Sequence, residues 1–105
     1  MINVKYDRDN LVLQMNGHAY GGEPGTDIIC SAASILVYTL AQNIQIMEHS
    51  KVAKDVHVIL EDGNALVSCR PVEDKETLQC IFDSVTTGFW LLHQNYPDNI
   101  QFFQK

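Results

Sequence analysis

Two β-hairpin patterns, each followed by one helix pattern, constrain the fold of this 105-residue chain more than any other feature. Residues 2–6 are short and β-prone, and residues 11–16 alternate between apolar and polar side chains, which is typical of a half-buried strand. Residues 56–60 and 65–70 repeat the arrangement around Asp62-Gly63, a dipeptide that favours a two-residue hairpin turn.

The first helix pattern follows a segment rich in glycine, residues 17–25, through which no regular element can run. Thr26 or Asp27 can cap this helix, which we expect to continue to about His49. Its early turns are apolar nearly all round, which predicts deep burial. The apolar positions are Ile28, Ile29, Ala32, Ala33, Ile35, Leu36, Leu40, Ile44 and Met47.

The second helix pattern is a single apolar stripe at spacings of three and four. It begins at Glu73 or Asp74, and Pro97 stops it. Residues 100–103 are a candidate for a short final strand. The stripe consists of Leu78, Ile81, Phe82, Val85, Phe89, Leu92 and Tyr96.

These elements predict one α+β domain over residues 1–105, in the order β-β-α-β-β-α with the candidate terminal strand. Hairpins pair their strands antiparallel, so we expect an antiparallel sheet with both helices packed on one face. The opposite face then needs a cover. A second copy of the chain is one such cover.

The composition limits where the protein works. No apolar run approaches the roughly 20 residues of a membrane span, and residues 1–10 lack the apolar core of a secretory signal. Three cysteines, none in a Cys-x-x-Cys pair, indicate thiols in a reducing compartment. We therefore expect a cytoplasmic protein that does not associate with a membrane.

The formal net charge of −6 limits the partners. An acidic surface repels phosphate backbones, so no direct nucleic-acid ligand is expected. The same surface attracts basic partners, a class that includes ribosomal proteins, histones and basic peptides. The alternative is that the charge only keeps the protein soluble.

His18 and Cys30 are the residues whose placement points to chemistry. His18 follows a predicted strand, and Cys30 lies in the first turn of the predicted helix, with the glycine-rich segment between them. Unpaired amides and the helix dipole favour an anion at a helix start, and a nearby imidazolium favours the thiolate further. The thiolate can attack a peptide carbonyl while His18 protonates the leaving amine.

The residues alone leave two details of this site undecided: which groups bind the oxyanion and which residue orients His18. The amides of Cys30 and Ser31 are candidates to bind the oxyanion of the tetrahedral intermediate. Asp27 is a candidate to orient His18, although helix capping competes for the same carboxylate. The alternative to a catalytic pair is a buried cysteine that acts as a small apolar side chain and a histidine satisfied by its surroundings.

The segment from His18 to Ser34 resembles the signature of the ribosomal-processing cysteine protease family Prp. The chain has Gly17-His18-Ala19, a short loop, and then Gly25-Thr26-Asp27-Ile28-Ile29-Cys30-Ser31-Ala32-Ala33-Ser34. The family pattern is Gly-His-Ala, a variable loop, and Gly-x-Asp-Ile-Val-Cys-Ala-Ala-Val-Ser. Weaker similarity continues at Gly88 and in the Tyr96-Pro97-x-x-Ile100 ending. Ser31 and Ala33 depart from the family's usual alanine and valine.

The resemblance implies a function. Cys30 matches the family's nucleophile and His18 its catalytic histidine. The motif residues Gly25, Asp27, Ser31 and Ser34 are expected to border the substrate, and the loop at residues 19–26 to cover the site.

Members of the family are homodimers that use no metal and no cofactor. They remove a short N-terminal extension from a basic large-subunit ribosomal protein. The extension typically ends in an Asn-Leu-Gln-Phe-Phe run just before the cut. This chain itself carries a similar run, Asn99-Ile100-Gln101-Phe102-Phe103, which we interpret as an edge strand, with product mimicry as the alternative.

Other assignments are weaker. His57, Cys69 and Cys80 match no zinc-binding spacing, so no metal site is expected. A non-catalytic module that binds a basic ribosomal protein is the first alternative function. A redox sensor is the second, and it needs Cys69 or Cys80 to form a disulfide with Cys30.

Overall fold

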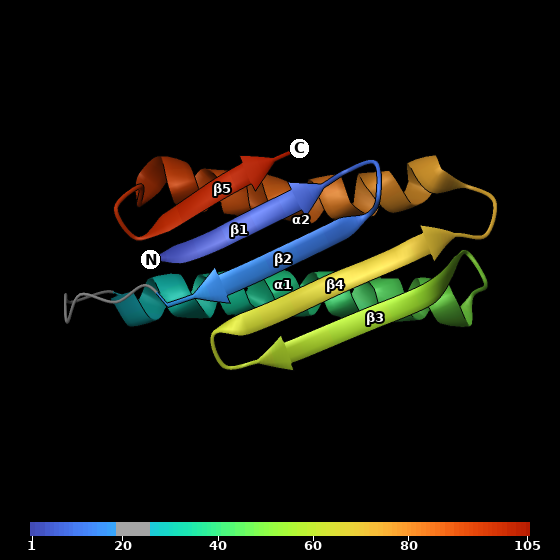
Figure 1. Ribbon diagram of the computed structural model, residues 1–105, viewed down its shortest axis with the longest axis horizontal. Coiled ribbons are helices and arrows are strands. Elements are labelled where there is room, and N and C mark those ends of the chain that lie inside the picture. Colours follow the sequence, from blue (N-terminus) through green and yellow to red (C-terminus); the bar gives the residue numbers. More distant parts are fainter. Residues whose placement is uncertain (19–25) are drawn as a thin grey trace.

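A computed structural model describes residues 1–18 and 26–105 of the chain. The elements follow the order β1 (Ile2–Asp7), β2 (Val12–Gly17), α1 (Thr26–His49), β3 (Ala53–Glu61), β4 (Asn64–Pro71), α2 (Lys75–Asn95) and β5 (Ile100–Gln104). Figure 1 shows one sheet in front and both helices behind it. The predicted α+β class, the element order and the terminal strand are therefore confirmed.

The sheet has five strands in the order β3-β4-β2-β1-β5. The pairs β3–β4, β4–β2 and β2–β1 are antiparallel, whereas β1 and β5 are parallel, so the prediction of a purely antiparallel sheet is wrong at this edge. The reason is the connection through α2, which returns the chain to the end of the sheet where β4 began. A strand that follows a helical crossover runs in the same direction as the strand before it.

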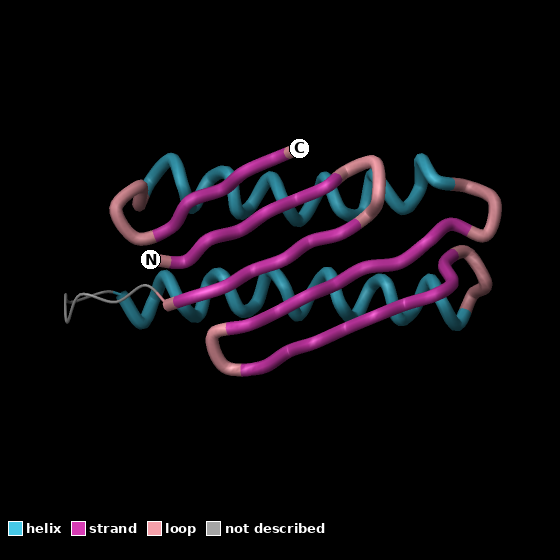
Figure 2. The backbone as a smooth tube through the Cα atoms, in the orientation of Figure 1, coloured by secondary structure: helices cyan, strands magenta, loops and turns pink. Residues whose placement is uncertain are grey.

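The core lies between the sheet and the two helices, which run antiparallel to each other (Figure 2). α1 packs on β3 and β4, and α2 packs mainly on β5. Burying one large apolar side chain contributes about 1.5–3 kcal/mol, so this single layer supplies most of the stability. The largest fully buried side chains are Tyr6, Phe82, Phe89, Leu11, Leu13, Leu40, Ile44, Leu78, Ile100, Val4, Val37 and Val67.

α1 is covered on one side only, which corrects the prediction of deep burial for its early turns. Ile28 and Ile35 are 69% and 61% exposed, whereas Ala33, Val37 and Leu40 are buried against the sheet. By length and composition alone, the segment Ile28–His49 could cross a membrane, with a mean hydropathy of 1.3. The sequence expectation that nothing approaches this length is therefore too strict, and the buried side of α1 belongs to the protein's own core.

α2 begins and ends close to where its sequence pattern predicts. The carboxylate of the N-cap residue Asp74 accepts a hydrogen bond of 3.1 Å from the Thr77 amide, which satisfies one of the unpaired donors of the first turn. The helix ends at Asn95, and Tyr96 forms its C-cap. Tyr96 is exposed rather than part of the buried stripe, because it follows the last helical turn.

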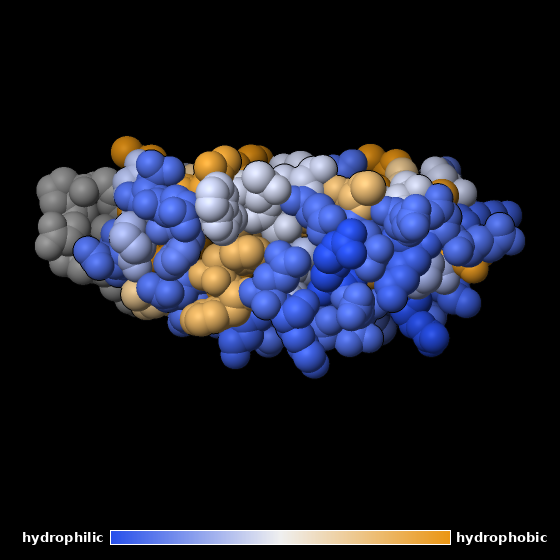
Figure 3. Space-filling model, turned by 90° about the horizontal axis from the view of Figure 1, so that it is seen from above, coloured by the Kyte–Doolittle hydropathy of each residue, from blue (hydrophilic) through white to orange (hydrophobic). Residues whose placement is uncertain are grey.

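The C-terminal Phe-Phe segment is part of the sheet. β5 pairs with β1 in the register Ile2 with Ile100, and Ile100 is fully buried. The segment is therefore an edge strand, as the sequence favoured. Figure 3 views this edge from above and shows a largely hydrophilic surface that a hydrophobic patch interrupts. Two large apolar side chains of the elements at this edge are exposed, Phe103 of β5 and Trp90 of α2.

Candidate functional site

His18 directly follows β2, and its backbone is held from two sides. The backbone nitrogen of Met1 donates a hydrogen bond of 2.6 Å to the His18 carbonyl oxygen. The preceding Gly17 donates from its amide to the Gly63 carbonyl oxygen at 3.0 Å. Gly17 has a φ of +96°, and a Cβ there would lie 2.2 Å from the Met1 carbonyl oxygen, so only glycine fits. The strand end therefore places the imidazole at a fixed point.

Cys30 lies on α1 and is partly buried. α1 begins at Thr26, so Cys30 follows the first turn rather than lying in it. In an α-helix that begins there, the amides of Cys30 and Ser31 donate to carbonyls four residues earlier. The expectation that these two amides bind an oxyanion is therefore not supported by the helix boundary.

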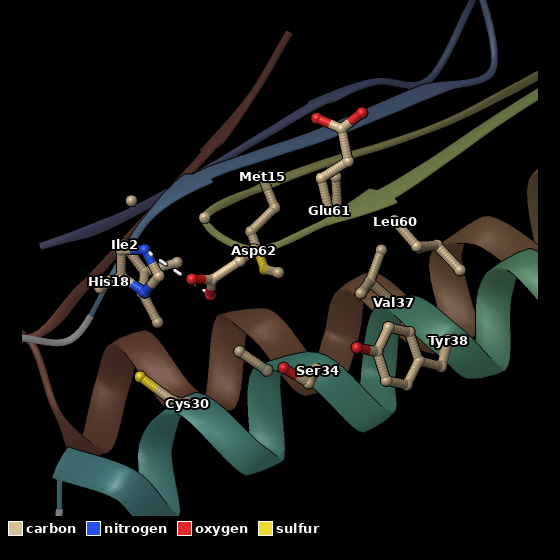
Figure 4. Close-up of a pocket in the computed structure, with 14 residues that line it drawn as sticks. Ile2, Met15, His18, Cys30, Ser34, Val37, Tyr38, Leu60, Glu61 and Asp62 are labelled. Carbon is tan, nitrogen blue, oxygen red and sulfur yellow. Dashed lines mark ion pairs between the residues drawn. The ribbon is translucent and has the colours of Figure 1, made fainter.

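His18 and Cys30 line one pocket of about 250 Å³ between α1 and the end of the sheet. Figure 4 shows the Cys30 side chain rising from α1 on the side of the pocket where His18 lies. Ile2, Met15 and Val37 supply apolar lining to the same pocket. The pocket thus combines a thiol, an imidazole and an apolar wall, which is the set of groups that peptide cleavage by a thiol requires.

The other predicted site residues divide into three cases. Ser34 lines the pocket one helical turn after Cys30, as expected. Ser31 is exposed on α1 and is not among the residues that line the pocket. Gly25 and the loop over the site lie outside the described residues, as does the side chain of Asp27, whose backbone belongs to α1.

Sequence reasoning missed Asp62 at this site. The carboxylate oxygen Oδ1 of Asp62 lies 3.9 Å from Nε2 of His18, and Figure 4 marks this ion pair across the pocket. The Asp62-Gly63 dipeptide indicated a hairpin turn, which is confirmed by the pairing of Glu61 with Asn64. No pattern along the chain indicated that this turn reaches His18, since the contact depends on how β4 pairs with β2.

The remaining cysteines lie elsewhere. Cys69 is buried in β4, and its burial raises the pKa of the thiol to about 11. Cys80 is exposed early in α2. All three cysteines are thiols. These positions do not favour a redox sensor, because neither Cys69 nor Cys80 lines the pocket that contains Cys30.

Metal chemistry finds no support in the described residues. Within residues 1–18 and 26–105, no group of three or more His, Cys, Asp or Glu side chains gathers in a way that could hold a metal ion. His57 is exposed in β3, on a different element from Cys69 and Cys80.

Comparisons with known proteins bear on the family and the fold. The family model described as cysteine protease Prp matches residues 1–101. Comparison with curated protein sequences gave no significant match. Among solved structures, the ribosomal processing protease Prp of Staphylococcus aureus with a covalently linked product peptide has a TM-score of 0.75 at 22% identity over 100% of both chains.

Two further structures show the same fold. The Staphylococcus aureus protease with a substrate peptide has a TM-score of 0.76 at 20% identity, again over 100% of both chains. A protein from Streptococcus mutans has a TM-score of 0.68 at 22% identity, over 98% of this chain and 90% of the other.

Proposed function

Because the chain belongs to the cysteine protease Prp family, we propose that it cleaves peptide bonds with Cys30 as nucleophile and His18 as the group that moves the proton. The observation that carries this proposal is that both side chains line one pocket. The two residues come from different elements, α1 and the end of β2, which the sheet brings together.

The reaction follows from these two groups. The Cys30 thiolate attacks the peptide carbonyl carbon, which forms a carbon–sulfur bond and an oxyanion. The His18 imidazolium then gives its proton to the amine as the carbon–nitrogen bond breaks, leaving a thioester on Cys30. His18 next takes a proton from water, whose oxygen attacks the thioester, and the proton returns to the sulfur as the acid product leaves.

The proposed substrate is the N-terminal extension of a basic large-subunit ribosomal protein. The net charge of −6 supports a basic substrate, since opposite charges speed the encounter of two proteins. The Staphylococcus aureus structures add support, because that protein is a ribosomal processing protease and one structure contains a substrate peptide. The proposal places the enzyme in the cytoplasm, where ribosomes are assembled.

The proposed peptide contacts come from the motif around Cys30. Ser34 is the residue with direct support, because it lines the pocket beside Cys30. Gly25, Asp27 and Ser31 remain proposals based on the family motif. The apolar wall formed by Met15 and Val37 suits an apolar side chain next to the cut, such as the phenylalanines of the expected Asn-Leu-Gln-Phe-Phe run.

Peptide cleavage tests the proposal directly. A peptide that contains Asn-Leu-Gln-Phe-Phe is incubated with the wild type and with Cys30→Ala, and the products are identified by mass spectrometry. We expect the wild type to cut after the second phenylalanine and Cys30→Ala to lose about 10⁴-fold or more in kcat, since the nucleophile is gone. Cys80→Ala is the matched control, because it removes an exposed thiol outside the pocket.

Two results would contradict the proposal. Equal cleavage by the wild type and Cys30→Ala would remove Cys30 as the nucleophile. A wild type that binds the peptide without cutting it would instead favour the alternative, a non-catalytic module for a basic ribosomal protein.

A further inference from the structure

The turn between β3 and β4 reaches the pocket and contacts His18. Nε2 of His18 lies 3.9 Å from the Asp62 carboxylate and against the backbone of Gly63. We propose that Asp62 is a positioning residue, which holds the His18 ring through Nε2 with the other ring nitrogen on the side of Cys30. This inference rests on the proposed Cys30–His18 pair and adds a third residue to it.

The turn between β3 and β4 is hydrogen-bonded to Gly17, the residue before His18. The Gly17 amide donates to the Gly63 carbonyl oxygen at 3.0 Å, and Asn16 of β2 pairs with Asn64 of β4. Because Gly17 and His18 are consecutive, a shift of the turn also shifts the imidazole. The backbone therefore keeps the turn that carries Asp62 next to His18.

Gly63 leaves room for the ring. A Cβ at Gly63 would lie 2.5 Å from Nε2 of His18 and 3.3 Å from both Cδ2 and Cε1. Gly63 also has a φ of +72°, a conformation that glycine adopts without strain. The imidazole thus packs directly on the Gly63 backbone, and a side chain at this position would displace the ring.

The orientation of the ring suits the proposed chemistry. Figure 4 shows Nε2 facing Asp62 and the second ring nitrogen on the α1 side of the ring, where Cys30 lies. A carboxylate beside Nε2 favours the tautomer with its proton on that nitrogen, so Nδ1 is left to accept the proton of the thiol. The same carboxylate stabilises the imidazolium that results.

The interaction gains strength when the pocket is occupied. The Asp62 side chain is 98% exposed, and an exposed pair at this distance contributes little in water. A peptide laid over the pocket excludes water, and catalytic contacts often tighten only in the complex. The effect of Asp62 should therefore appear in kcat rather than in KM.

Glu61 supplies a matched control for the charge. Its carboxylate points away from His18 in Figure 4, although it is next to Asp62 in the chain. Asp62→Asn and Glu61→Gln each remove one negative charge from the same turn. Only the first removes a carboxylate that faces the ring. Asp62→Glu restores the charge with a longer side chain.

Steady-state kinetics on the peptide substrate tests the proposal. We expect Asp62→Asn to lower kcat roughly fivefold with KM changed less than about twofold, and Asp62→Glu to recover most of the loss. When kcat/KM is measured against pH, the alkaline limb should move to lower pH in Asp62→Asn, because the imidazolium of His18 is no longer stabilised by the carboxylate of Asp62. Other titratable side chains that line this pocket are Cys30, Tyr38 and Glu61. Glu61→Gln also removes a charge from the pocket lining, but not a carboxylate that faces the ring, so it should change kcat and shift the alkaline limb less than Asp62→Asn does.

The outcomes separate this proposal from the proposed function. If Cys30→Ala is inactive but Asp62→Asn behaves as Glu61→Gln does, the positioning role is overturned and the Cys30–His18 pair stands. If Cys30→Ala still cleaves the peptide, both fail. A loss of kcat in Asp62→Asn that Asp62→Glu does not recover and that leaves the alkaline limb unmoved also overturns the positioning role.

Discussion

At the scale of single residues, the three cysteines of this chain differ in their surroundings. Cys30 lines the pocket with His18, Cys69 is buried in β4, and Cys80 is exposed early in α2. Burial raises the pKa of Cys69 to about 11, which keeps its thiol protonated at neutral pH. Exposure alone would make Cys80 the most reactive thiol, whereas the proposed function makes it Cys30.

Thiol alkylation distinguishes these possibilities. We expect iodoacetamide at neutral pH to modify Cys30 at least about tenfold faster than Cys80, because an adjacent imidazolium favours the thiolate. Cys69 should react last, since it is buried and protonated. Peptide mass mapping over time measures all three rates in one sample. Replacement of His18 by alanine should bring Cys30 close to the rate of Cys80, and equal rates in the wild type would contradict the proposed pair.

At the scale of elements, a polar cluster attaches the β1–β2 hairpin to α2. The hydroxyl of Tyr6 donates to Asp83 at 2.8 Å, and Nε of Arg8 contacts both carboxylate oxygens of Asp83 at 3.1 Å. The Tyr6 ring also stacks on Phe82, with centroids 5.8 Å apart. Burial and the Asp83 carboxylate both raise the pKa of Tyr6, so the phenol stays neutral and remains a donor.

Substitution of the acceptor should cost more than substitution of one donor. Tyr6→Phe leaves Asp83 paired with Arg8 and should lower the free energy of unfolding by about 1 kcal/mol. Asp83→Ala leaves both donors without their acceptor and should cost about 1–3 kcal/mol. Urea unfolding followed by Trp90 fluorescence measures both. Asp9→Ala, which removes an exposed carboxylate from the same hairpin, should cost less than about 0.5 kcal/mol. Equal losses for Asp83→Ala and Asp9→Ala would refute the attachment.

At the scale of the whole molecule, one layer of helices covers one face of the sheet and leaves two surfaces outside. The open face of the sheet carries polar side chains such as Lys5 and Gln14, which water can cover. The outer side of α1 instead exposes Ile28 and Ile35. We therefore propose that a homodimer, if formed as the family resemblance implies, covers the outer side of α1 rather than the open sheet face.

Sedimentation equilibrium measures this assembly. We expect the wild type to have twice the mass of one chain, and Ile35→Lys to have the mass of one chain because a charge then lies in the apolar contact. Gln42→Lys is the control, since it adds the same charge at an exposed polar position of α1. A wild type that stays at the mass of one chain at every concentration would contradict the homodimer. Dimers of both variants would place the contact on another surface.

The sequence by itself determined the elements and indicated His18 and Cys30 as the candidate pair. Hairpin turns, capping residues and apolar spacing are local features, so the order of elements, the Asp62-Gly63 turn and the start of α2 next to Asp74 could all be predicted. The motif around His18 and Cys30 is likewise continuous in the chain apart from one loop. Local chemistry is enough to identify such features because they depend on neighbours in sequence.

Only the tertiary structure decided how the elements combine. The crossover through α2 made β5 parallel to β1, and α1 turned Ile28 and Ile35 outward because the sheet covers one side of the helix. The contact of Asp62 with His18 likewise depends on the pairing of β4 with β2, residues distant in the chain. Contacts between distant segments carry no local pattern, because they depend on how separate elements pack together.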